Sequence, residues 1–169
     1  MSVPDAPTTE LLRALCAGEP DRLTETIELT RQLHHVNDVL WTLEDEARTT
    51  CDERELGLLK RRIDGYNVRR AALVSAIDGT LGQLLPPGPA GVPPLASSLG
   101  TSLDRLTVAA RRAAVLAGAD DERADDAHQQ LVDLRTALHA DHADVMAGRR
   151  RLPLAGVLKR YGAPSPPSP

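Results

Sequence analysis

Residues 33–48 read Leu33-His34-His35-Val36-Asn37-Asp38-Val39-Leu40-Trp41-Thr42-Leu43-Glu44-Asp45-Glu46-Ala47-Arg48. Apolar side chains recur there at steps of three and four residues, at Leu33, Val36, Leu40, Leu43 and Ala47. This spacing predicts a helix with one buried face. Each apolar residue is followed by a member of a second row: His34, Asn37, Trp41, Glu44 and Arg48. Since one residue turns a helix by about 100°, the second row borders the buried face. We therefore expect this row to form the wall of a site.

The same reasoning predicts three further long helices and no strand. The first helix should run from Pro20 or Asp21 to about Thr49, and the second from Asp52 to Leu84. The third should follow Ser97 or Ser98 and end at Gly118. The fourth should start near residues 120–121 and close at Gly148. These limits rest on N-capping residues and on the breakers Gly and Pro.

A short helix is also expected at residues 8–15, and the Pro-rich segment 86–96 should be a crossover between the second and third long helices. The predicted fold is therefore an all-α bundle of four long helices. We expect a single domain over residues 1–162, followed by a disordered Pro/Ser tail at 163–169. With no Phe, one Trp and two Tyr, the core must be built mainly from aliphatic residues, which suits helices.

Composition excludes several classes of function. A net charge of −4 argues against general nucleic-acid binding, and no apolar run is long enough to span a bilayer. The start of the sequence has no basic region followed by an apolar one, so we do not expect secretion. Cys16 and Cys51 are too few and too far apart to form a metal motif, and we expect reduced thiols in a cytoplasmic protein.

The chain resembles a bacterial all-helical family known as domain of unknown function 4254. Four blocks carry the resemblance, at residues 34–48, 60–78, 103–106 and 147–161. Val68 stands where the family tends to have Gln, and Ala71-Ala72 stand where it tends to have Asn-Asp. The resemblance implies a helical bacterial domain. It also suggests an association with glycan or surface-polysaccharide genes, without indicating a mechanism.

Metal and nucleophilic chemistry are poorly supported by the sequence. Asp125 with His128, and His139 with His142, could each share a helical face, but the Glu-x-x-His pairs of di-iron bundles are missing. Neither cysteine lies beside a recognisable base, and the chain has no Gly-x-Ser-x-Gly sequence and no phosphate-binding Gly loop. We therefore expect neither a metal nor an organic cofactor.

Electrostatic chemistry is the remaining possibility, with a site between the first two long helices that the third helix closes. Arg48, Lys60, Arg70 and Arg105 would hold negative groups of a small polar or anionic ligand. Glu44, partly desolvated beside Trp41, would transfer a proton. Asn37, Trp41, Asp64 and Asn67 would contact or orient the ligand. Glu44, Arg70 and Lys60 are the candidate catalytic residues of this small-molecule enzyme or binding domain.

Two alternatives stay open. The charged side chains could pair internally, Glu44 with Arg48 and Lys60 with Asp64. Arg70 interrupts an apolar row and needs a carboxylate partner, for which Glu44, Asp45 and Asp104 are the candidates. On the functional side, the chain could instead be a non-catalytic interaction or scaffold protein for a biosynthetic complex, and could form a homodimer.

Overall fold

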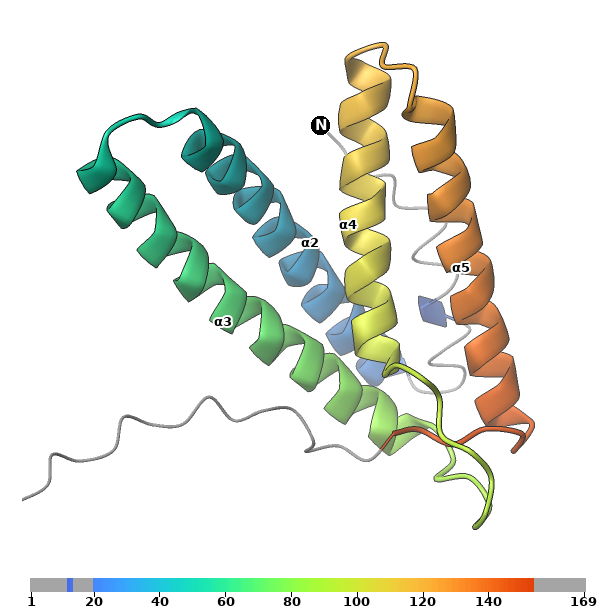
Figure 1. Cartoon of the computed structure of the whole chain (residues 1–169). Helices are drawn as coiled ribbons and strands as arrows, with labels where there is room; N and C mark the ends of the chain where they lie inside the picture. The colour runs from blue at the N-terminus through green and yellow to red at the C-terminus, as the bar shows by residue number, and fades with distance from the viewer. Residues whose placement is uncertain (1–11, 14–19, 154–169) are drawn as a thin grey trace, which may run out of the picture.

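The computed structural model describes residues 12–13 and 20–153. It contains four long helices: α2 (Pro20–Thr49), α3 (Glu53–Leu84), α4 (Leu99–Gly118) and α5 (Ala124–Met146) (Figure 1). The predicted all-α fold is confirmed. Of the short helix expected at 8–15, only Leu12 and Arg13 are described, and both are helical. The domain limit at 162 and the tail at 163–169 lie outside the described residues.

Local signals in the sequence fix most of the helix ends. Pro20 opens α2, where its missing N–H costs no hydrogen bond. The Asp52 carboxylate accepts hydrogen bonds from two amides in the first turn of α3, and Ser98 caps α4. Only the start of α5 was predicted incorrectly. It begins at Ala124, because Asp121 binds the amide of Arg123 and holds a turn before the helix.

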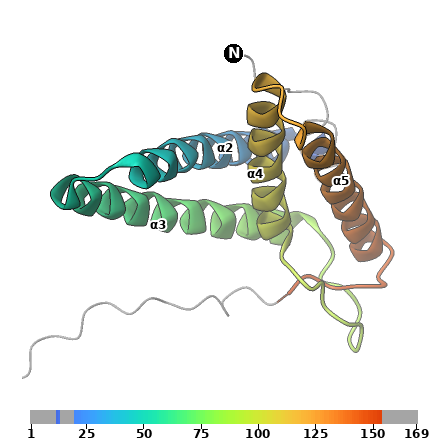
Figure 2. The ribbon, with the colours of Figure 1, turned by 45° about the horizontal axis from the view of Figure 1, so that its top comes forward.

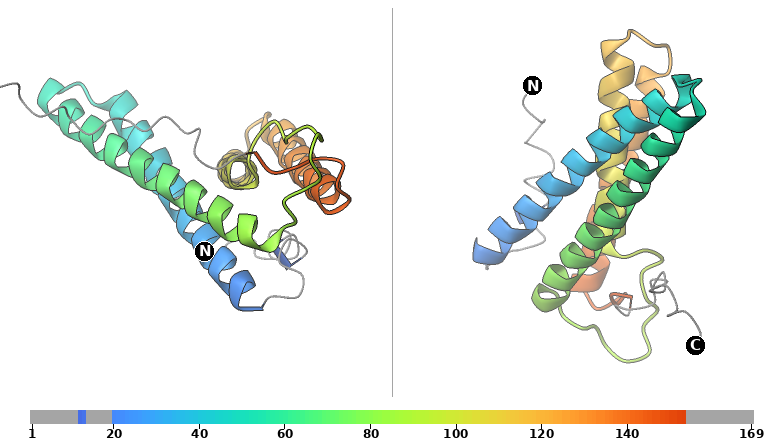
Figure 3. Two further views of the ribbon diagram at one scale, coloured as in Figure 1. Left: turned by 90° about the horizontal axis from the view of Figure 1, so that it is seen from below. Right: turned by 90° about the vertical axis from the view of Figure 1, so that its left-hand side faces the viewer.

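The four helices form two hairpins, α2 with α3 and α4 with α5. Helix α4 packs against both α2 and α3, whereas α5 packs mainly on the side of α4 that faces away from them (Figure 2). The left view of Figure 3 shows α4 end-on while α2 and α3 run across the view, so α4 crosses the first hairpin steeply. The end of that hairpin between Thr49 and Glu53 therefore projects beyond α4.

The predicted apolar rows form the core. On α2, the four residues from Leu33 to Leu43 in the apolar row are no more than 7% exposed. The core is completed by the aliphatic side chains of the other helices, chiefly Leu59, Ile63, Leu73, Ile77, Leu81, Leu99, Leu103, Leu106, Leu138 and Val145. Burial of such rows supplies most of the stability of the helices.

The Pro-rich crossover between α3 and α4 is held against the segment that follows α5. Pro94 and Arg151 form an isolated β-bridge, in which the Leu95 amide donates to the Arg151 carbonyl at 2.9 Å. Gly88 adopts a φ of 75°, and a side chain there would meet the Cβ of Arg151 at 2.8 Å. The crossover is thus fixed in place at this end of the bundle.

Helices α3 and α4 approach closely at Gly100. The Gly100 amide donates a 2.7 Å hydrogen bond to the Asp78 carboxylate of α3. A Cβ at this glycine would lie 2.6 Å from the carbonyl oxygen of Val74, so no larger residue fits without movement of the backbone. The contact fixes the start of α4 against α3.

Candidate functional site

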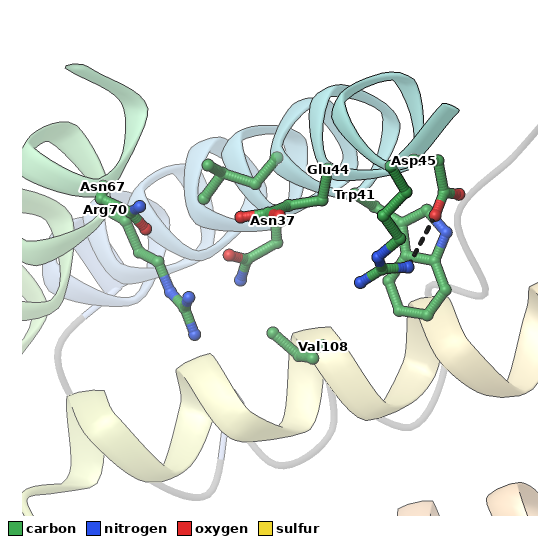
Figure 4. Close-up of a pocket in the computed structure, with 9 residues that line it drawn as sticks. Asn37, Trp41, Glu44, Asp45, Asn67, Arg70 and Val108 are labelled. Carbon is green, nitrogen blue, oxygen red and sulfur yellow. Dashed lines mark hydrogen bonds and ion pairs between the residues drawn. The ribbon is translucent and has the colours of Figure 1, made fainter. Parts of the chain in front are cut away.

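An open pocket of about 180 Å³ lies where α4 crosses the first hairpin (Figure 4). Helix α2 supplies most of its wall, α3 supplies two residues and α4 supplies one. The lining residues are Asn37, Leu40, Trp41, Glu44, Asp45, Arg48, Asn67, Arg70 and Val108. Four of the five residues in the second row of α2 therefore line one pocket, and only His34 lies outside it.

A buried polar network closes one end of the pocket. The Arg70 guanidinium makes a two-pronged contact with the Asp104 carboxylate, from Nε to Oδ1 at 2.8 Å and from Nη2 to Oδ2 at 2.6 Å. Asn37 donates from Nδ2 to Asp104 Oδ1 at 3.0 Å and to the Thr107 hydroxyl at 2.8 Å. Asp104 thus links α2, α3 and α4 through charge-assisted hydrogen bonds, which are the stronger kind.

This network answers one of the questions that the sequence left open. Of the three carboxylates considered for Arg70, Asp104 is the partner, and its side chain is only 11% exposed. The bonds of Nε and Nη2 to Asp104 hold the Arg70 guanidinium in place. Its Nη1 makes no hydrogen bond within the described chain, so this nitrogen stays available to the pocket that Arg70 lines. Asn37 is 5% exposed, and its Oδ1 is a buried acceptor without a partner in the described residues.

The other end of the pocket is charged and open. Arg48 bonds to Asp45 at 3.0 Å, and the two side chains are 71% and 55% exposed. The Glu44 carboxylate has no ion pair or hydrogen bond within the described part of the chain. The expected pairs of Glu44 with Arg48 and of Lys60 with Asp64 do not form there. Glu44 is exposed, so the partial desolvation expected beside Trp41 is not found.

Three predicted site residues lie away from the pocket lining. Lys60 and Asp64 are exposed on α3, nearer its start than the lining residues Asn67 and Arg70. Arg105 is exposed on α4 and donates to the Ser97 hydroxyl at 3.3 Å. The structure therefore brings together Asn37, Trp41, Glu44, Arg48, Asn67 and Arg70, and separates the remaining three from them.

Helix α4 carries a second row of its own, which the sequence reasoning overlooked. One residue after Leu99, Leu103, Leu106 and Ala110 come Gly100, Asp104, Thr107 and Arg111. Each of the four makes a polar contact with α2 or α3. Gly100 and Asp104 do so as described above, Thr107 binds Asn37, and Arg111 lies 3.4 Å from Asp38. The offset that identified the row on α2 would have found these residues as well.

The histidine-rich part of α5 does not line this pocket. Burial lowers the pKa of His142, with a further contribution from His139. Burial and the nearby Asp144 raise the pKa of Asp141. Within residues 12–13 and 20–153 no group of three or more His, Cys, Asp or Glu side chains could hold a metal ion.

The fold and the pocket define an all-helical domain with a polar, open pocket between two helical hairpins. The chain belongs to the family described as a protein of unknown function (DUF4254), whose model matches residues 27–154. The match includes every residue that lines the pocket. No curated protein and no solved structure matches the sequence. None of the helices described here is long and apolar enough to cross a membrane.

Proposed function

We propose that this domain binds a small polar or anionic ligand in the pocket between α2, α3 and α4, as a binding domain or as a small-molecule enzyme. One observation carries the proposal: seven polar or aromatic side chains from two helices meet at a single open cavity. They are Asn37, Trp41, Glu44, Asp45, Arg48, Asn67 and Arg70. A few convergent polar groups in a concave site are the usual mark of a ligand pocket.

The network behind the pocket supports a binding role. Arg70 is held by Asp104 through two hydrogen bonds, so ordering its side chain adds little to the entropic cost of binding a ligand. Its Nη1 and the exposed Arg48 would bind the oxygen atoms of a carboxylate or phosphate. Asn67 and Trp41 would orient the rest of the molecule.

Glu44 is the candidate for proton transfer if the domain is an enzyme. Its carboxylate lines the pocket and has no partner in the described chain, so a bound ligand could reach it. Lys60, the other expected catalytic group besides Arg70, does not line the pocket and has no role in this proposal. The proposal keeps the expectation of a cytoplasmic bacterial protein that acts in a glycan or specialised-metabolite pathway.

The chain contains one tryptophan, and it lines the pocket, which makes binding directly observable. The indole N–H signal of Trp41 in a two-dimensional NMR spectrum should move on titration with a probe that binds there. Suitable probes are inorganic phosphate, citrate, N-acetylglucosamine and uridine diphosphate glucose. Saturable movement with at least one of them is expected.

Matched variants test whether the response comes from the pocket. Arg48→Ala and Asn67→Ala should weaken the response, because both residues are exposed and line the cavity. Lys60→Ala is the control, since Lys60 is exposed on α3 outside the lining. Equal binding by all three variants, or no saturable response to any probe, would contradict the proposed function.

An interaction role is the second candidate, supported by two exposed apolar side chains on α3. Val68 is 72% exposed and Leu58 is 51% exposed. If α3 mediates self-association, light scattering should give twice the 18.2 kDa chain mass, and Val68→Asp should restore the monomer. A monomer at all concentrations would exclude the homodimer.

A further inference from the structure

The charges at the pocket indicate what kind of ligand fits. Two acidic and two basic side chains line it. Both basic groups already have a carboxylate partner, Asp45 for Arg48 and Asp104 for Arg70. Glu44 is the lining charge that has no partner within the described residues. A positive group on the ligand would therefore pair with Glu44.

The surroundings of Glu44 suit an ammonium group. The Glu44 carboxylate would form a direct ion pair with a cation. Val108 provides an apolar surface on α4 across the pocket. The Trp41 indole is directed toward the other end of the pocket, beside the ion pair of Asp45 with Arg48. Glu44 and Val108 thus form a subsite for the amine of a small molecule.

The end of the pocket toward which Glu44 is directed also offers donors for a ligand oxygen. Figure 4 shows the Glu44 side chain directed back along α2, toward the end at which Asn67 and Arg70 lie. Helical side chains commonly lean in this direction. Glu44 and Arg70 form no ion pair with each other within the described residues, and both line the pocket, so each can contact a ligand there. Nη1 of Arg70 and the Asn67 amide are the donors available there.

We propose that the ligand is a small zwitterion, whose ammonium group binds Glu44 and whose carboxylate or phosphate oxygen binds Arg70. This inference rests on the proposed function, because it names the class of ligand for the same pocket. It narrows the earlier expectation of an anionic ligand, since an anion alone would leave Glu44 unpaired and would be repelled by it.

Three probes with one carbon skeleton separate the possible ligand classes: 4-aminobutyrate, butyrate and butylamine. Each is titrated into the full chain while the Trp41 indole N–H signal is followed. We expect 4-aminobutyrate to bind about ten-fold more tightly than either single-charge probe, since one charge-assisted contact contributes about that factor. Glu44→Gln should weaken 4-aminobutyrate about ten-fold and should not weaken butyrate, whose repulsion by Glu44 it removes. Glu46→Gln, an exposed residue of α2 outside the lining, should change neither.

Each contrary result overturns a stated part of the inference. If butyrate binds as tightly as 4-aminobutyrate, the proposed ammonium subsite at Glu44 is refuted. If butylamine binds as tightly as 4-aminobutyrate, the proposed binding of a ligand oxygen by Arg70 is refuted. If none of the three binds while phosphate or uridine diphosphate glucose does, the zwitterion is refuted and the proposed function stands. If neither set moves the Trp41 signal, both fail.

Discussion

Removing the ion pair between Arg70 and Asp104 should destabilise the protein more than any exposed pair would. In Asp104→Ala, the guanidinium of Arg70 loses both of its hydrogen bonds while its side chain remains only 33% exposed. Breaking a buried pair typically costs 3–5 kcal/mol, and the partial exposure of Arg70 favours the lower limit of about 3 kcal/mol. Arg70→Ala should cost a similar amount, because the Asp104 carboxylate is more deeply buried.

The coupling between the two side chains is the quantity that tests this reasoning. A double-mutant cycle should give an interaction free energy of about 2 kcal/mol, the range for charge-assisted hydrogen bonds between contacting residues. Urea unfolding followed by circular dichroism measures it. With a slope of about 2 kcal/mol per molar, each single variant should unfold at about 1.5 M less urea.

The control is a second pair of Arg with Asp, which lies at the surface. Arg48 and Asp45 are 71% and 55% exposed, so their coupling should be below about 1 kcal/mol. Additivity within about 0.5 kcal/mol for Arg70 with Asp104 would refute the reasoning, because it would mean that the contact between these side chains contributes no stability of its own. Equal coupling for both pairs would refute the assumption that burial sets the difference.

Two further predictions concern α3, α4 and α5. Gly100→Ala should lower the free energy of unfolding by about 2 kcal/mol, since its Cβ would meet the Val74 carbonyl at 2.6 Å. Gly79→Ala, with nothing within 4 Å of the new Cβ, should raise the free energy of unfolding by up to about 1 kcal/mol. If urea unfolding shows a change of the same sign for both variants, the close approach of α3 and α4 at Gly100 is contradicted. Burial, with a contribution from Asp144, raises the pKa of Asp141 above 3.8, so Asp141→Asn should increase the melting temperature at neutral pH. That gain should vanish as pH falls below 3.8, where Asp141 is protonated in both folded and unfolded chains, and a gain independent of pH would contradict it.

The helices could be predicted because their signals are local. The spacing of apolar residues, the caps Asp52 and Ser98, and the Pro-rich crossover each act within a few residues of chain. The start of α5 was misplaced for a local reason too. Asp121 does not cap α5; its carboxylate accepts a hydrogen bond from the Arg123 amide and closes a turn before the helix begins.

The partners of charged residues could be predicted only where burial forces a choice. Arg70 had to find a carboxylate because it interrupts an apolar row, and Asp104 was one of three candidates. Arg48 had no such constraint: on an exposed helix surface, pairing with Glu44 or with Asp45 differs by less than about 1 kcal/mol. Lys60 and Asp64 failed to join the pocket for another reason. The pocket forms where α4 crosses α2 and α3, and the position of that crossing depends on packing between distant segments. The periodicity of one helix carries no information about it.

The crossing of α4 over the first hairpin explains why one row of residues serves two purposes. Asn37, near the crossing, is 5% exposed and belongs to the network that ties three helices together. Trp41, one turn later, is half-buried, and Glu44 and Arg48 are exposed, because α2 continues past α4 toward the projecting end of the hairpin. Burial therefore decreases along a single helical row, from residues that stabilise the fold to residues that can reach a ligand. A pocket placed at this boundary combines an arginine fixed by the core with a carboxylate left free by the solvent-exposed end, which is the pairing that a small zwitterion requires.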